Sequence, residues 1–190
     1  MKKLLLVSGF ILALSACSTS KKSQLTISPQ PTISSIAITQ NVLVMVESRD
    51  LRTAQFVAII DNGPQNIQLI HPTSNMRIML ENALIRQLSS QGYRVTTHAK
   101  GKLRLDLLNS LVKVEYSAFS HTITTNVQIQ LVAETSNNKF VQRYSGQSTT
   151  QGTISASFVD MEIALNRLLE AALQDIARDK KLSSFMNKNF

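Results

Sequence analysis

Only a few residues of this 190-residue sequence have the types and spacing that chemistry at a site requires. The clearest is Cys17, the single cysteine, whose thiolate is a good nucleophile and which follows two small residues, Ser15 and Ala16. The three histidines stand alone without the spacing of metal ligands, and the sequence has no phosphate-binding loop, dinucleotide fingerprint or Gly-x-Ser-x-Gly motif. We therefore expect no catalytic residue, no metal site, no cofactor and no enzymatic activity. The histidines are His71, His98 and His121, the last of which we expect to be solvated at a strand end.

A charged cluster is the next candidate. Arg49, Asp50 and Arg52 place two guanidinium groups beside one carboxylate, and this combination is able to hold a phosphate or an acidic glycan. The alternative, which we favour, is that Asp50 holds its own turn while the arginines pair with Glu47 or with solvent. The cluster is therefore a ligand site or a structural turn.

The first sixteen residues have the parts of a bacterial signal peptide. Lys2 and Lys3 precede an apolar run, residues 4–14, that is shorter than the about 20 residues needed to span a bilayer as a helix. The ending Leu-Ser-Ala-Cys resembles the lipobox of bacterial lipoproteins. This resemblance implies that the Cys17 sulfur receives a diacylglyceryl group, that signal peptidase II cuts between Ala16 and Cys17, and that the new amine is acylated, typically by palmitate. The alternative is an ordinary signal peptide in which the cysteine is coincidental.

The residues after Cys17 predict where the protein lies. Asp directly after the lipidated cysteine is the inner-membrane retention signal of enteric bacteria, so Ser18 predicts the outer membrane, with the folded part facing the periplasm. Residues 17–35 are rich in Ser and Thr and contain two prolines, which predicts a lipidated cysteine followed by a flexible tether. We expect residues 36–190 to form a single α+β periplasmic domain.

The charge balance gives no sign of a nucleic-acid partner. The formal net charge of +8 falls to +6, with 18 basic and 12 acidic residues, once the signal peptide is removed. The basic residues are dispersed and have no interleaved aromatic residues on which bases would stack. Asp106 and Glu115 lie on one predicted strand, where pairing with Arg or Lys explains them better than the acid pair of a glycosidase.

Hydrophobic periodicity predicts the fold class. Alternating apolar residues indicate strands, and apolar residues at three- and four-residue steps indicate two helices, the first capped by Ser74 or Asn75. Because clean alternation leaves one sheet face wet, both helices should cover the other face. We predict an α+β two-layer sandwich, with a mostly antiparallel sheet and two helices packed on one face. The predicted strands are 41–48, 53–60, 67–70, 93–99, 102–116 with a bend between 108 and 111, 122–134 and 139–150; the helices span 76–91 and 157–179, and residues 182–190 should be loose apart from a packing contact of Phe185 and Met186.

The chain resembles the YajG family of uncharacterised bacterial lipoproteins. The resemblance lies in the lipobox at Cys17, the turn at residues 50–53, the helix and its exit at 79–95, and the strands at 102–105 and 122–133. It implies a periplasmic lipoprotein associated with the outer membrane, without an assigned activity, and it supplies no catalytic residues.

Two functions fit these observations. The first is a non-enzymatic binding or accessory component of the cell envelope, tethered by the lipid on Cys17, that binds an envelope protein through a sheet edge or the exposed sheet face. The second is an envelope enzyme or carrier that acts on cell-wall or lipid fragments. This second function predicts a concave pocket with convergent polar groups and a perturbed titratable residue.

Overall fold

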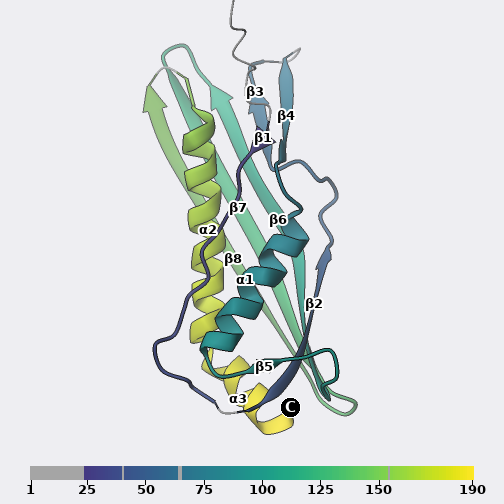
Figure 1. Ribbon diagram of the computed structural model, residues 1–190. Coiled ribbons are helices and arrows are strands. Elements are labelled where there is room, and N and C mark those ends of the chain that lie inside the picture. The colour runs from purple at the N-terminus through teal and green to yellow at the C-terminus, as the bar shows by residue number, and fades with distance from the viewer. Residues whose placement is uncertain (1–23, 40, 64–65, 154) are drawn as a thin grey trace, which may run out of the picture.

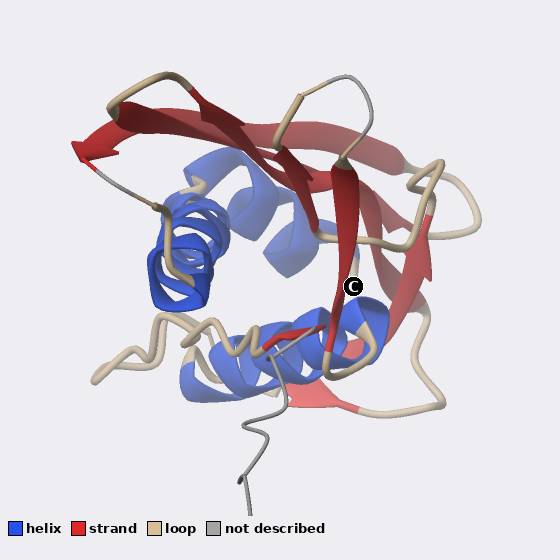
Figure 2. Cartoon of the chain, turned by 90° about the horizontal axis from the view of Figure 1, so that it is seen from above, coloured by secondary structure: helices blue, strands red, loops and turns tan. Residues whose placement is uncertain are grey.

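The computed structural model describes residues 24–39, 41–63, 66–153 and 155–190 (Figure 1). It is an α+β fold, as the periodicity predicts, in which a curled sheet encloses the helices (Figure 2). The strands are β1 (Gln24–Leu25), β2 (Leu43–Asp50), β3 (Ala58–Asp61), β4 (Ile67–Pro72), β5 (Arg94–Val95), β6 (Gly101–Tyr116), β7 (Ser120–Glu134) and β8 (Lys139–Thr153), and the helices are α1 (Met76–Ser90), α2 (Phe158–Arg178) and α3 (Lys180–Asn189).

Three long strands, β6, β7 and β8, make up the largest part of the sheet. β6 pairs with β7, and β7 with β8, both in antiparallel register. The register of β6 shifts between Leu107 and Asn109, which is the bend that the slip in the apolar pattern predicts. Because of this shift, Leu103, Leu105 and Leu107 before it and Val112 and Val114 after it all lie in the hydrophobic core.

The sheet is mixed, so the prediction of a mostly antiparallel sheet is wrong. β2 and β3 run parallel to β6, β2 beside its first half and β3 beside its second half. β5 is parallel to β2, and β1 is parallel to β4, whereas β3 and β4 are antiparallel. Helix α1 carries the chain back before β6 begins, and such a crossover produces parallel pairing. The predicted strands at 53–60 and 93–99 are shorter than expected, because residues 53–57 form a loop and only Arg94 and Val95 pair.

Each helix begins at a side-chain cap. Asn75 accepts the backbone N–H groups of Arg77 and Ile78 at the start of α1. Ser157 and Asp160 form a reciprocal capping box at the start of α2. Asp179 ends α2 and caps a third helix, α3, which buries Leu182 and Met186. The expected packing of Phe185 and Met186 is confirmed, but the expectation of an otherwise loose tail at 182–190 is wrong, because the residues form a capped helix.

The N-terminal segment is packed against the helices from Gln24 onward. Leu25 and Ile27 lie in the core, while the backbone N–H groups of the residues that alternate with them, Thr26 and Ser28, point to α2. Thr26 donates to Glu162 at 2.5 Å, Ser28 to Asn166 at 2.8 Å and Gln30 to Glu170 at 3.0 Å, and Thr32 donates to Gln87 of α1 at 3.1 Å. The prediction of a flexible tether is thus wrong for residues 24–35, and the boundary predicted at residue 36 lies too late.

Candidate functional site

Asp50 and Arg52 form a closed turn. Arg52 donates through Nε and Nη2 to the two carboxylate oxygens of Asp50, at 2.9 and 2.8 Å, and through Nη1 to the carbonyl of Phe56 at 3.3 Å. The Arg52 side chain is only 6% exposed. Burial would raise the pKa of Asp50, but the hydrogen bonds from Arg52 outweigh it, and the pKa is lowered. Asp50 therefore holds its own turn, and Arg52 pairs with Asp50 instead of Glu47 or solvent.

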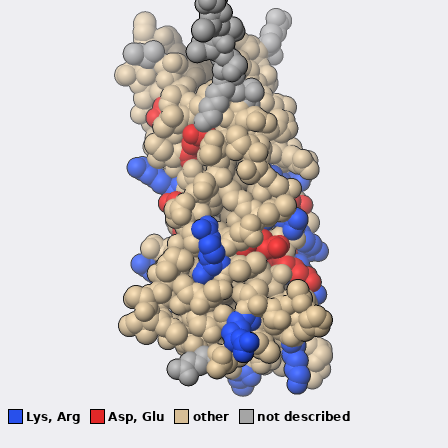
Figure 3. Space-filling view, in the orientation of Figure 1, with Lys and Arg blue, Asp and Glu red and all other residues tan. Residues whose placement is uncertain are grey.

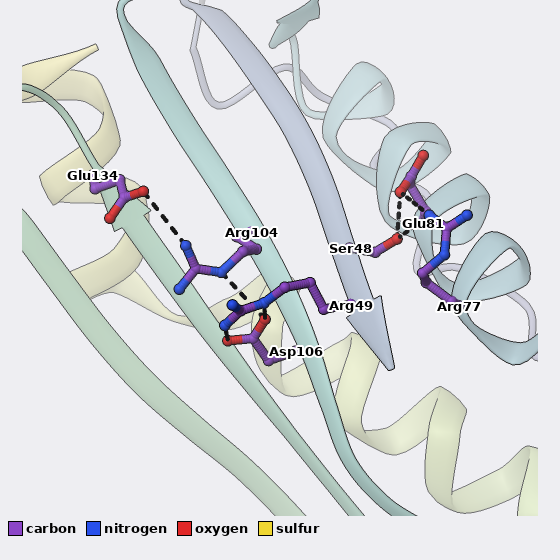
Figure 4. Close-up of polar contacts among 7 residues, drawn as sticks. All are labelled: Ser48, Arg49, Arg77, Glu81, Arg104, Asp106 and Glu134. Carbon is purple, nitrogen blue, oxygen red and sulfur yellow. Dashed lines mark hydrogen bonds and ion pairs between the residues drawn. The ribbon is translucent and has the colours of Figure 1, made fainter. Parts of the chain in front are cut away.

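Arg49 belongs to a different cluster, on the sheet face that points away from the core (Figure 4). It lies opposite Asp106 of β6 and donates to both carboxylate oxygens, Nε to Oδ1 at 2.7 Å and Nη2 to Oδ2 at 2.8 Å. Arg104 adds a third hydrogen bond to Asp106 at 3.2 Å and contacts Glu134 at 3.5 Å. Arg49 and Asp50 are therefore neighbours in the sequence but belong to different clusters in the fold. The pairing of Asp106 with arginine agrees with the sequence-based expectation.

Asp106 is charged although its side chain is only 1% exposed. Burial would raise its pKa, but the hydrogen bond from Arg49 and the positive charges of Arg104 and Arg49 lower it below the ordinary value. The same hydrogen bond raises the pKa of Arg49. The carboxylates of Asp106 and Glu134 balance the two guanidinium groups, so the cluster stabilises the outer sheet face and leaves little attraction for an added anion.

A second polar contact joins the sheet to helix α1 (Figure 4). Ser48 of β2 donates its hydroxyl to the carboxylate of Glu81, and Arg77 donates to Ser48 at 3.1 Å and to Glu81 at 3.4 Å. Glu115 pairs with Lys113 of the same strand at 2.7 Å. These carboxylates have structural partners and do not form an acid pair.

His121 is buried, and the expectation of a solvated histidine is wrong. The residue is 7% exposed, and its ring lies 6.1 Å from that of Tyr116. The ring lies over Gly152, the residue opposite it on β8, where a Cβ would come within 2.5 Å of the imidazole Cε1. Among the described residues, no hydrogen-bond partner is present for the buried Nδ1. Gly152 makes room for the buried ring, but only the strand register shows that this glycine lies opposite His121.

His121 lines a cleft between helix α2 and the adjoining ends of β7 and β8. Its volume of about 530 Å³ lies in the range of small-molecule sites. Ser157 donates its backbone N–H and its hydroxyl to Asp160 at the rim; these hydrogen bonds, with a smaller contribution from His121, lower the pKa of Asp160. Other lining residues are the apolar Ile123, Ile163, Ala164 and Leu168, the hydroxyl-bearing Ser148, Thr150 and Ser155, and the charged Arg167.

The polar side chains of the cleft make few contacts with one another among the described residues. Within the described residues, no hydrogen bond joins His121 to a serine hydroxyl, and no ion pair joins Arg167 to a carboxylate. His71 and His98 are exposed, and His98 contacts the hydroxyl of Thr97 at 2.9 Å. Cys17, Ala16 and Ser18, the predicted lipidation, cleavage and sorting residues, lie outside the described residues.

Comparison with known proteins assigns the family. A family described as "Uncharacterized lipoprotein" matches residues 29–187 of this chain. The chain belongs to this family. Among its relatives is the uncharacterized lipoprotein YajG of Escherichia coli strain K12, 24% identical over 149 residues, which cover 78% of this chain and 77% of the relative. YajG of the O6:H1 strain is similar to the same extent. The resemblance to the YajG family is thereby confirmed.

Membership of a lipoprotein family makes the chain a membrane-anchored envelope protein. Among the described residues, no helix is long and apolar enough to span a bilayer. A crystal structure of a protein from Xanthomonas campestris shares the fold with a TM-score of 0.54 at 12% identity, over 88% of this chain and 98% of that one. A second crystal structure, of an uncharacterized protein, has a TM-score of 0.53 at 13% identity, over 82% and 99%.

Proposed function

We propose that this protein is a lipoprotein anchored through Cys17 in the outer membrane, where it acts in the periplasm as a non-enzymatic binding component of the cell envelope. One observation carries the proposal: the cleft lined by His121 lies directly beside the edge of β8 that has no strand partner among the described residues. We assign to this cleft and edge the binding of an extended segment of an envelope protein.

The edge of β8 is suited to strand addition. Within the described residues β8 pairs only with β7, so one side of its 15-residue backbone lacks a strand partner. Exposed edges are normally protected by charges, prolines or bulges. The charges of β8, Lys139 and Arg143, lie in its first five residues, and residues 144–153 contain neither a charge nor a proline. An added strand would hydrogen-bond to this edge and direct alternate side chains toward the cleft.

A second function draws on the cleft alone. The cleft combines apolar walls with the Arg167 guanidinium and the His121 imidazole, which suits a carrier of lipid or cell-wall fragments. The two functions differ in the size of the bound species, because a carrier holds a small molecule and an accessory component holds a polypeptide.

A photo-crosslinking residue in place of Ile163, which lines the cleft and is 43% exposed, tests both functions in cells that make the full chain. We expect a protein adduct at this position and none at the control position Ile36, which is 75% exposed and precedes β2. Gly152→Ala should weaken the adduct severalfold because the added Cβ displaces His121, whereas Gly146→Ala, which meets only the end of the Leu168 side chain at 3.2 Å, should not. An adduct a few hundred daltons heavier than the chain would favour the carrier, and equal labelling at both positions would refute a site in the cleft.

Fractionation tests the anchor separately. Cys17→Ala should accumulate unprocessed or released protein, because the side chain that receives the lipid is absent. Ser18→Asp should move the lipidated protein to the inner membrane, while Ser18→Ala leaves it in the outer membrane. Normal processing of Cys17→Ala together with an unchanged outer-membrane fraction would refute the lipid anchor.

A further inference from the structure

One end of the molecule carries both the start of β1 and several exposed apolar side chains. The turn between β6 and β7, the start of β4 and the start of α2 lie at the upper end in Figure 1, where β1 also begins. Phe119 in the β6–β7 turn is 89% exposed, Ile67 at the start of β4 is 57% exposed, and Val159 in the first turn of α2 is 56% exposed. We refer to these three exposed side chains at the upper end together as the apolar tip.

The charged groups near the apolar tip are held by internal partners. Lys113 of β6 pairs with Glu115, and the carboxylate of Asp61 accepts the backbone N–H of Gly63. Asp160 is engaged by the capping box of α2. In the view of Figure 3 the upper end is largely free of Lys and Arg, which are spread over the middle and the lower end. Desolvation of the apolar tip would therefore leave few unpaired charges.

The opposite end is basic. Lys100 precedes β6, and the starts of β6 and β8 and the whole of α3 lie at the lower end in Figure 1. The lysines of these segments are Lys100, Lys102, Lys139, Lys180, Lys181 and Lys188. These lysines make the lower end basic, and β1 begins at the opposite end, where the apolar tip lies.

The number of residues before β1 limits how far the fold stands from its lipid. Seven residue steps separate Cys17 from Gln24, and a fully extended chain of that length spans at most about 25 Å. Because residues from Gln24 onward are bound to α2 and β4, they add nothing to this reach. A lipid on Cys17 therefore holds the apolar end within one tether length of the bilayer.

We infer that the apolar tip formed by Phe119, Ile67 and Val159 rests on the lipid surface, with the basic end directed into the periplasm. The inference depends on lipidation of Cys17, which belongs to the proposed function. An aromatic side chain at a loop tip is well suited to the boundary between head groups and acyl chains. The contact fixes the orientation of the fold and places the β8 edge and its cleft at the side of the molecule, close to the membrane.

The absence of tryptophan from the sequence makes a direct test possible. Phe119→Trp would be introduced into the full-length lipoprotein, which would be purified and reconstituted into phosphatidylethanolamine–phosphatidylglycerol vesicles with and without brominated acyl chains. We expect the emission of the introduced indole to shift to shorter wavelength and to fall by at least half with brominated lipid. The control is Asn137→Trp, in the exposed turn between β7 and β8 at the basic end, whose emission should stay water-like and unquenched.

Each remaining outcome counts against the inference. Water-like, unquenched emission from the vesicle-bound Phe119→Trp variant would overturn it and leave the lipid anchor intact. A blue shift without quenching would mean that a second copy of the chain covers the apolar tip. Protein that never enters the vesicle fraction would refute the anchor on Cys17, and with it this orientation.

Discussion

Asp106 remains ionised because two arginines compensate for the loss of water around it. A carboxylate this deeply buried loses most of its hydration, and three hydrogen bonds from Arg49 and Arg104 replace it. Its pKa in the folded protein lies below the ordinary value of 3.8. The charged form therefore stabilises the fold at every pH above that value, and this contribution is lost as the pH falls through the lowered pKa.

Asp106→Asn should lower the free energy of unfolding at pH 7 by about 2 kcal/mol, because an amide cannot accept three charged hydrogen bonds and leaves guanidinium donors unpaired. Urea titration measures the change, and the variant should also lose less stability than the parent between pH 5 and pH 3. The matched control is Glu115→Gln on the same strand, whose ion pair with Lys113 is about half exposed and should contribute little. Equal effects of the two substitutions would contradict this account of Asp106.

At the scale of the element, the N-terminal segment pairs with α2 because the two have similar repeat distances along their axes. Two residues of extended chain advance about 6.6 Å, and four residues of helix advance about 6.0 Å. Alternate N–H groups of Thr26, Ser28 and Gln30 therefore meet acceptors four residues apart, namely Glu162, Asn166 and Glu170. The helix side chains replace a neighbouring strand, so the segment is ordered beyond β1 without pairing in the sheet.

Asn166→Ala should free the Ser28 N–H and raise its hydrogen-exchange rate about fivefold, which corresponds to a loss of about 1 kcal/mol. Exchange measured by NMR on the full mature chain resolves this amide from its neighbours. Gln174→Ala is the control, because Gln174 continues the four-residue row of α2 but accepts no N–H group from the segment among the described residues. Unchanged exchange at Ser28 in Asn166→Ala would mean that the segment is held by Leu25 and Ile27 alone.

The same segment illustrates what sequence patterns can and cannot predict. Strong local periodicity identified α1, α2, the three long strands and the bend in β6, because each pattern extends over many residues. The order of residues 24–30 depends on acceptors about 136 to 140 positions away, and that of Thr32 on Gln87, 55 positions away; no local pattern records these partners. The burial of His121 escapes local patterns for a related reason, because it depends on Gly152 of the neighbouring strand. Parallel pairing of β2 and β3 with β6 likewise follows from the crossover through α1.

For the whole molecule, the shifted pKa values predict that the free energy of unfolding falls at both low and high pH. The pKa values of Asp50, Asp106 and Asp160 are lowered, so their stabilisation is present above about pH 4 and declines below it. Burial raises the pKa of Tyr93 to about 12 and also raises that of Tyr144. Since the unfolded chain loses these phenol protons near pH 10, stability should fall as the pH rises above about 10.

The loss of stability at high pH should depend on the contacts between α3 and the rest of the fold. Tyr144 donates its hydroxyl to Asp179, the residue shared by the ends of α2 and α3, at 2.7 Å, and Tyr93 donates to Asn187 of α3 at 3.2 Å. Tyr144→Phe should cost about 1 kcal/mol at pH 7 and make unfolding between pH 9 and pH 11 less dependent on pH, because one raised phenol pKa is removed. Tyr116→Phe is the control, since its hydroxyl makes no hydrogen bond among the described residues. Urea titration followed by circular dichroism at each pH gives the dependence of the free energy of unfolding on pH for the variant and the parent. The same dependence in Tyr144→Phe and the parent would show that this hydroxyl does not link α3 to the stability of the molecule at high pH.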